Sequence, residues 1–262
     1  MDFDEFAAQH YSALAGDEIR HNVLLAILRR RRADPDLHVR VWHFGQPGCC
    51  AVQQRGYGIV LAAAKREQVQ SLAGDVAKED IPSVMGPDDT ATWFVEASAD
   101  LGTDYPNMMA QTIHALDHQP RHPNCDGNAR LATRDDIGLV LEWLTAFVDE
   151  AVPEDQEPTL EDVRQRIEKK RVYLWCVDER PVAMSCVGRQ LEAGIAIAPV
   201  YTPPELRRRG YAGAATAEIV EQALRRGYRF ACLFTDDSNP AATRCYANIG
   251  FRPYCKSNMY RK

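Results

Sequence analysis

The stretch Val200–Val220, VYTPPELRRRGYAGAATAEIV, decides the fold, because it joins the end of an apolar strand to the start of a long helical pattern. Its two prolines end the strand, and three arginines stand just before the predicted helix start at Gly210: Arg207, Arg208 and Arg209. The first amides of a helix have no intrahelical acceptor and lie at the positive end of the helix dipole. The stretch therefore predicts a site for an anion such as pyrophosphate, bound by main-chain amides and arginine side chains.

Gly210 and the small residues behind it fit a close approach of that anion. Glycine adopts backbone angles that other residues resist, and small side chains such as Ala212 keep the first helical turn narrow. The pattern is neither GxxxxGK followed by Ser or Thr nor GxGxxG, so it is not a Walker loop or a dinucleotide-binding loop. On this stretch alone, a surface turn that is merely covered by arginines is the alternative interpretation.

Composition and charge exclude several classes of function. The chain has 262 residues, 45% of them hydrophobic, and apolar runs such as GIVLAAA at residues 58–64 are far too short to cross a bilayer. Residues 1–125 carry 11 Lys and Arg against 17 Asp and Glu, and the remainder carries 20 of each. We therefore expect neither a nucleic-acid nor a membrane partner. Because MDFDEF lacks the basic start and apolar core of a signal peptide, we expect the cytoplasm.

Neither the cysteines nor the histidines form a convincing metal-binding pattern. The eight cysteines show no CxxC spacing and are expected to be buried, reduced thiols. His114, His118 and His122 have the spacing of metal ligands on a helix, but Pro120 interrupts any helix there. We therefore predict loop histidines and no metal.

Hydrophobic periodicity predicts two mixed α/β halves. In the first half, helices are predicted over residues 18–32, 66–76 and 88–100, and strands over 38–44, 49–54, 58–63 and 109–116. The segment DHQPRHPNCDGN, residues 117–128, cannot continue a helix or a central strand. The predicted domains are accordingly residues 1–125 and 126–262.

The second half predicts the order β-α-α-β-β-β-α-β-α-β, a mixed sheet with helices packed on its faces. Thr133 is a good N-cap for the first of these helices. Later in the half, SNPAATRCYANIGF places Asn239 and Tyr246 seven residues apart, two helical turns, and so on one face of a helix. Taken without context, Asn239 is only a helix cap and Tyr246 only a core aromatic.

These two motifs together resemble the GCN5-related N-acetyltransferase (GNAT) superfamily. RxxGxA at Arg207–Ala212 follows the strand end APVYT and precedes a strand and the SNPAATRCYANIGF helix, and the resemblance covers residues 128–262. More loosely, residues 1–125, with the helix EIRHNVLLAI and a turn at IPSVMGP, resemble the degenerate N-terminal half of two-domain acetyltransferases. The implied fold class is α/β, a mixed α+β sheet in tandem GNAT-like domains, with the acetyl-CoA site in the C-terminal domain.

The resemblance also implies a role for each matching position. Amides from Arg208 to Ala212 would hold the pyrophosphate of acetyl-CoA, and Tyr246 would be the general acid beside the sulfur. Backbone groups of Val200 and Thr202 would bind the pantetheine arm, with the Val200 amide polarising the thioester carbonyl, and Asn239 would contact the pantetheine or the adenosine diphosphate end. The implied cofactor-binding set is Val200, Tyr201, Thr202, Arg207, Arg208, Arg209, Gly210, Tyr211, Ala212, Asn239 and Tyr246.

One departure concerns the general base. Many members of the superfamily carry a glutamate on the fourth strand, whereas GIAIAPVYT has no acid. Glu192 lies just before this strand and Glu205 just after it, and neither is assigned as the base. Proton removal through water, or binding of an already neutral amine, would replace it.

The implied function is direct transfer of an acetyl group from acetyl-CoA to a primary amine of a small molecule or peptide, without a metal. The alternative is a CoA-binding regulatory or interaction protein of the same fold without turnover. The missing acid favours this alternative and Tyr246 opposes it. Peptidoglycan-type aminoacyl transfer is disfavoured, because that group usually dispenses with a CoA loop. No pattern in the sequence identifies the acceptor, the acyl-chain length or the oligomeric state.

Overall fold

A computed structural model of the chain describes residues 2–87, 89–153 and 156–262. The chain forms two compact units. Residues up to His114, together with Phe234–Pro240 and Pro253–Lys262, make up the first unit, and the remainder makes up the second. The predicted domains 1–125 and 126–262 do not coincide with these units, because two late segments of the chain pack with the first unit. The assignment of those domains stays a prediction.

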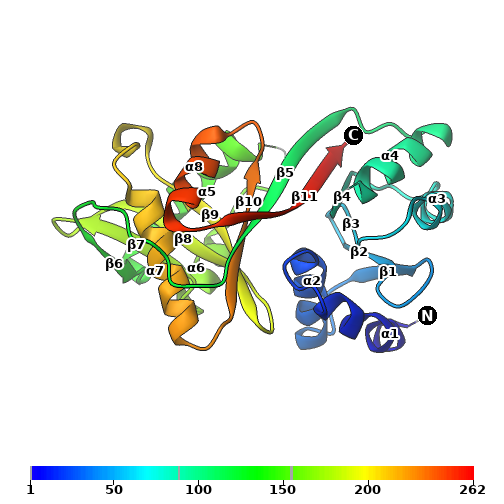
Figure 1. Cartoon of the computed structure of the whole chain (residues 1–262), viewed down its shortest axis with the longest axis horizontal. Helices are drawn as coiled ribbons and strands as arrows, with labels where there is room; N and C mark the ends of the chain where they lie inside the picture. Colours follow the sequence, from blue (N-terminus) through cyan, green and yellow to red (C-terminus); the bar gives the residue numbers. More distant parts are fainter. Residues whose placement is uncertain (1, 88, 154–155) are drawn as a thin grey trace. The chain divides into compact units, whose positions relative to one another are not determined.

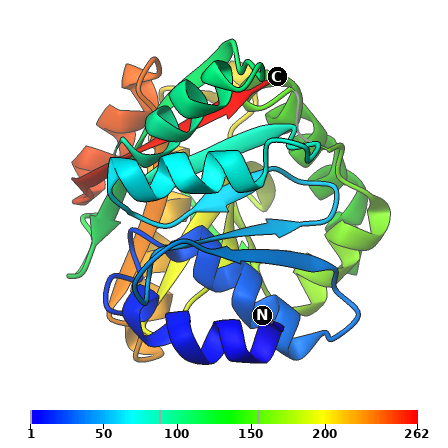
Figure 2. The same ribbon diagram turned by 90° about the vertical axis from the view of Figure 1, so that its right-hand side faces the viewer.

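The first unit combines helices and strands that the sequence largely predicts. Its helices are α1 (Phe3–Ala15), α2 (Asn22–Ala33), α3 (Arg66–Asp75) and α4 (Thr90–Asp100). Its strands follow the order β1 (Val39–His43), β2 (Cys50–Gln54), β3 (Ile59–Leu61), β4 (Ser83–Pro87), β11 (Arg252–Arg261) and β5 (Asn107–Leu116). β3 and β4 are parallel, whereas β4 and β11 are antiparallel. Figures 1 and 2 show α1 and α2 on one side of β1–β4, and α3 and α4 on the other.

Two elements of this unit differ from the expectation. α1 was not expected; Asp2 caps it, with the Glu5 amide 2.9 Å from the Asp2 carboxylate. The turn expected at IPSVMGP is wrong, because residues 83–87 form β4, whose buried Val84 packs in the same core as Phe94 of α4. Helix α4 begins at Thr90, and the predicted start at residue 88 lies outside the described residues.

The second unit has the predicted mixed α/β architecture. Its strands follow the order β10 (Phe230–Asp236), β9 (Gly194–Tyr201), β8 (Arg180–Gln190), β7 (Val172–Val177) and β6 (Asn128–Leu131). Its helices are α5 (Ile137–Ala151), α6 (Leu160–Glu168), α7 (Tyr211–Arg225) and α8 (Pro240–Ile249). β9 and β10 are parallel, and the other pairs are antiparallel.

Alternation along β7 places helices on both faces of this sheet. Val172 and Leu174 share a core with residues of α5 and α6, whereas Tyr173 shares one with residues of α7. Successive side chains of a strand point to opposite faces of the sheet. Helices α5 and α6 therefore cover one face, and α7 covers the other. α8 adds Ile249 to the α7 side.

The β9–β10 ladder is short, and this positions the site. The two strands pair only over Gly194–Ala196 and Phe230–Cys232. β9 continues beyond this point by pairing with β8, where Ser185 lies opposite Val200. The part of β9 that leads into the arginine-rich turn therefore has a strand partner on the β8 side only.

Candidate active site

The turn between β9 and α7 has the backbone that the sequence predicts. After β9, a 3-10 turn at Pro204–Leu206 leads to Arg208 and Gly210, whose φ angles are +64° and +86°. Left-handed backbone of this kind is easily reached by glycine and costly for other residues. Helix α7 begins at the next residue, Tyr211, as predicted.

Main-chain amides in this turn are available to a ligand. The first helical bond of α7 joins the Ala214 amide to the Gly210 carbonyl at 3.0 Å. Within the described part of the chain, the amides of residues 208–213 have no hydrogen-bond acceptor. We call residues 208–213 the anion turn. Six consecutive unsatisfied amides at a helix start form a cradle for an anion.

The arginines of the turn have different environments. Arg207 donates from Nε to the Thr202 carbonyl at 2.9 Å, and both of its terminal nitrogens contact the Glu150 carboxylate of α5. Its guanidinium is thus engaged within the protein, and its contact with a pyrophosphate stays a prediction. Arg208 and Arg209 are exposed, and neither has a side-chain partner among the described residues.

The end of β9 offers backbone groups and one orphan hydroxyl. Tyr201 packs against Trp143 with ring centroids 6.2 Å apart, and Tyr211 packs in a core with Trp175. Both tyrosine side chains are buried in these cores. The Thr202 hydroxyl is buried and has no hydrogen-bond partner in the described chain. Such a group is costly in a folded protein and is typical of a ligand-facing position.

Tyr246 has features of both a core aromatic and an acid. It lies on α8, half-buried, with its ring edge-on to Phe251 at a centroid distance of 6.1 Å. Burial raises the pKa of the Tyr246 phenol above its ordinary value, so the hydroxyl stays protonated at neutral pH. No described residue hydrogen-bonds this hydroxyl. The proton therefore remains available to a ligand.

The remaining predicted residues are exposed. Asn239 is exposed, donates from its amide to the Asp236 carbonyl at 3.0 Å and belongs to the first unit, whereas Tyr246 belongs to the second. Their participation in one site stays a prediction. Glu192 and Glu205 are both exposed. Sequence reasoning missed Glu150, because an acid near the end of an amphipathic helix carries no signal of its partner.

The histidines also occupy separate environments. His114 lies 3.0 Å from the Thr235 hydroxyl, His118 contacts Asp117, and His122 contacts Glu221 of α7. Among residues 2–87, 89–153 and 156–262, no group of three or more His, Cys, Asp and Glu could hold a metal ion. The same residues include no helix long and apolar enough to cross a membrane.

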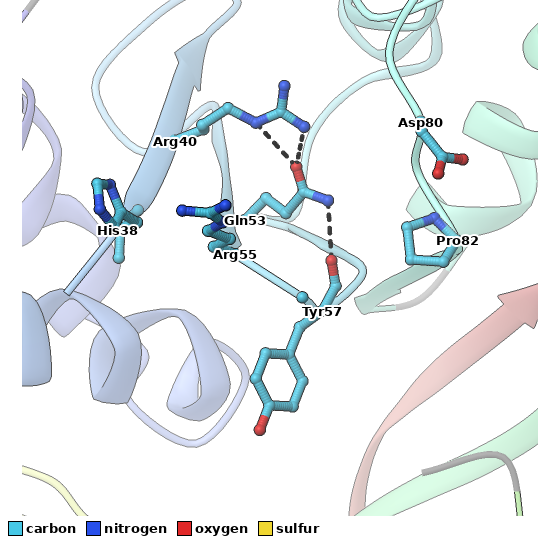
Figure 3. A pocket seen from close by; sticks show the side chains of 9 residues that line it. His38, Arg40, Gln53, Arg55, Tyr57, Asp80 and Pro82 are labelled. Carbon is cyan, nitrogen blue, oxygen red and sulfur yellow. Dashed lines mark hydrogen bonds between the residues drawn. The ribbon is translucent and has the colours of Figure 1, made fainter. Parts of the chain in front are cut away.

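A cavity of about 470 Å³ lies in the first unit (Figure 3). Figure 3 shows Arg40 held by Gln53, whose amide in turn donates to the Tyr57 carbonyl at 2.8 Å. His38, Arg55 and Asp80 complete the labelled lining. None of the predicted site residues lines this cavity, so it offers no support for the predicted chemistry.

A mixed sheet whose parallel strand pair ends early is followed by the anion turn at the start of α7. Residues 139–251 match the model of the Acetyltransferase (GNAT) family. The match does not include residues 1–138. No curated protein matches the chain.

Solved structures resemble the fold over nearly the whole chain. A Drosophila protein of 12% identity has a TM-score of 0.72 and covers 100% of this chain and 97% of its own. The GCN5-related N-acetyltransferases from Kribbella flavida and Sphaerobacter thermophilus, both 18% identical, have TM-scores of 0.61. The first covers 93% of this chain and 94% of its own, and the second 95% and 93%. These likenesses support the fold that the sequence predicts.

Proposed function

We propose that the protein is an acetyl-CoA-dependent N-acetyltransferase that transfers an acetyl group directly to a primary amine. The observation that carries the proposal is the anion turn, whose amides lie unsatisfied within the residues that match the GNAT family model. Acetyl-CoA matches this turn because its pyrophosphate is the anion that a helix start and two exposed arginines attract.

Each part of the site has a distinct task in this proposal. The amides of the anion turn bind the pyrophosphate, with Arg208 and Arg209 adding charge. The backbone of residues 200–202 binds the pantetheine arm, and the orphan hydroxyl of Thr202 gains a partner there. The Val200 amide polarises the thioester carbonyl, because a fixed N–H stabilises the negative charge that develops on its oxygen.

Proton transfer determines the roles of Tyr246 and of the missing acid. As the amine nitrogen bonds to the carbonyl carbon, the carbon–sulfur bond breaks and the departing sulfur takes a proton from the Tyr246 hydroxyl. A phenol is protonated at neutral pH, so the Tyr246 hydroxyl has a proton to give. β9 carries no acid, so the proton of the amine leaves through water or the amine binds neutral.

A second candidate, a CoA-binding regulatory or interaction protein without turnover, is favoured by the same absence of an acid on β9. Release of free thiol from acetyl-CoA, measured against a panel of small-molecule and peptide amines, separates the two candidates. Amine-dependent release supports transfer. Tight CoA binding without release for any amine would favour the regulatory protein.

The number of cofactor sites tests the proposal independently of turnover. Calorimetric titration with acetyl-CoA should give one site per chain, because the anion turn that we assign to the pyrophosphate lies in the second unit. Absence of binding at millimolar cofactor would contradict both candidates. The cytoplasmic location, and the expected lack of nucleic-acid and membrane partners, stay predictions from composition.

A further inference from the structure

Residues 121–126, which we call the strap, precede the matched domain in sequence and lie across α7 and α8 in the second unit. Three contacts hold the strap in place. The Arg121 amide donates to the Ile249 carbonyl at 2.9 Å, His122 Nε2 lies 3.1 Å from a Glu221 carboxylate oxygen, and Trp175 Nε1 donates to the Asp126 carbonyl at 2.9 Å. The first joins the strap to the end of α8, the second to α7 and the third to β7.

The middle of the strap touches the anion turn. A methyl group added at Gly210 would lie 3.3 Å from Pro123 Cβ and 3.7 Å from Cys125 Sγ. One added at Gly213 would lie 3.1 Å from Pro123 Cγ and 3.5 Å from Cys245 Sγ. Pro123 and Cys245 of α8 therefore both lie beside Gly213 in the first turn of α7, and we call the packing of Pro123 against Gly210 and Gly213 the wedge. Tyr246 is the next residue of α8 after Cys245.

We propose that the strap completes the cofactor site: Pro123 and Cys125 close one side of the anion turn, and Pro123 sets its distance from the helix that carries Tyr246. This inference rests on the proposed function, since it concerns the same site. Pro123 is a positioning residue, acting through the anion turn and α8. The proline ring restricts rotation of the side chain and fixes φ. Pro123 therefore keeps the distance between the anion turn and α8 at little entropic cost.

The proposal makes cofactor affinity depend on residues outside the matched domain. Close packing tolerates little displacement, and the amides of residues 208–213 bind well only while they converge on one point. A looser wedge therefore weakens pyrophosphate binding first. The scheme gives the strap a role in cofactor binding alone, so it predicts no change in the KM for the amine.

Substitution of Pro123 tests the wedge. We expect Pro123→Gly to raise the KM for acetyl-CoA by about tenfold, as loss of preorganisation does, while the KM for the amine and the melting temperature change little. Pro35→Gly, at an exposed turn of the first unit, makes the same chemical change and should leave both KM values unaltered. Equal KM values for acetyl-CoA in Pro123→Gly and the unaltered protein would overturn the proposal.

Alkylation of native cysteines tests whether Cys125 closes one side of the anion turn. It needs no substitution, which matters if Pro123→Gly does not fold. Cys125 and Cys49 are both half-buried free thiols, and only Cys125 adjoins the anion turn. With acetyl-CoA at ten times its Kd, iodoacetamide should modify Cys125 about tenfold more slowly, whereas Cys49 reacts at its original rate. Labelling is read by mass spectrometry of the separate peptides.

The outcomes also separate this inference from the proposed function. If acetyl-CoA binds by calorimetry but leaves Cys125 as reactive as before, the strap is not part of the site and the inference alone fails. If acetyl-CoA does not bind at all, the proposed function fails with it. Protection of Cys125 without protection of Cys49 supports both.

Discussion

Gly210 and Gly227 stand at opposite ends of α7 with nearly the same backbone, φ +86° and +90°. A side chain at either position costs about 1–2 kcal/mol in left-handed backbone. We expect Gly210→Glu to abolish binding of acetyl-CoA in calorimetry, because it places bulk and negative charge among the amides of the anion turn. Its free energy of unfolding should fall by that backbone cost and by the cost of displacing Pro123, whose Cβ would lie 3.3 Å from the added side chain.

Gly227→Glu is the matched control for this change. A side chain at Gly227 meets nothing within 4 Å, and the residue lies beyond the other end of α7. Its variant carries the same charge and similar strain, but should bind acetyl-CoA normally. Comparable loss of affinity in both variants would mean that strain, rather than the anion turn, governs binding.

Tyr246 is either a packing residue or a catalytic one, and the two roles predict different activities for Tyr246→Phe. Tyr246→Phe keeps the ring that meets Phe251 and removes the hydroxyl. General acid catalysis contributes roughly 10²–10⁴ in rate. We expect kcat to fall at least about tenfold, discounted because water partly replaces the phenol, with little change in cofactor affinity or melting temperature.

Tyr57→Phe controls for the loss of a phenol elsewhere, since Tyr57 is exposed in the first unit. It should turn over like the unaltered protein. Full activity of Tyr246→Phe, with the chemical step shown to limit the rate, would assign Tyr246 to the core and favour the regulatory alternative.

Among the elements, the connection from β9 to α7 depends on the pair formed by Arg207 and Glu150. Because both members act by holding the turn, we expect Arg207→Ala and Glu150→Ala to raise the KM for acetyl-CoA by factors of the same order, the first somewhat larger because it also removes the bond to the Thr202 carbonyl. Those factors should be about two- to fivefold, the scale of an exposed ion pair. Steady-state kinetics at varied acetyl-CoA concentration measures both.

Glu168→Ala breaks another exposed pair of the second unit, with Arg134, and should not change this KM. A direct contact between Arg207 and the pyrophosphate predicts a different result. Removing a charge-assisted bond costs more than about tenfold in affinity. The KM for acetyl-CoA would then rise far more in Arg207→Ala than in Glu150→Ala.

Elements with a strong local signal were predictable from the sequence, and those defined by distant partners were not. α7 is recognisable because glycine, small residues and helical periodicity coincide at Gly210 and Gly227. β4 is not, because its sequence SVMGP contains glycine and proline and becomes a strand only by pairing with β3 and β11. The same limit applies to Glu150, whose partner lies on a different element.

At the scale of the whole molecule, buried histidines predict how stability depends on pH. Burial lowers the pKa of His10, His21 and His114 below the ordinary 6.5. The Ala63 amide donates to His21 Nε2, and the Gly48 amide donates to His10 Nδ1, so each of these nitrogens is an acceptor and unprotonated. The folded chain therefore binds fewer protons than the unfolded chain just below pH 6.5.

From that difference, the free energy of unfolding should fall as pH decreases through 6.5 toward 5. Urea unfolding at pH 7.5, 6.5 and 5.5 measures the effect. The Arg130 guanidinium lowers the pKa of Asp136 to about 2. The stabilisation of the fold by this ion pair is lost only as pH falls from 3.8 toward that value. A constant urea midpoint between pH 7.5 and 5.5 would show that these histidines do not control stability.

The pairing of β4 with β11 has a consequence for biosynthesis. Val84 lies opposite Tyr260, and both belong to the core of the first unit, although a ribosome makes them at very different times. A strand that waits for so distant a partner gives high contact order and slow folding. Until β11 is made, the backbone groups of β4 on that side stay unpaired and can pair with other chains. We therefore expect the nascent protein to depend on chaperones. Expressing residues 126–262 alone would leave β11 without β4.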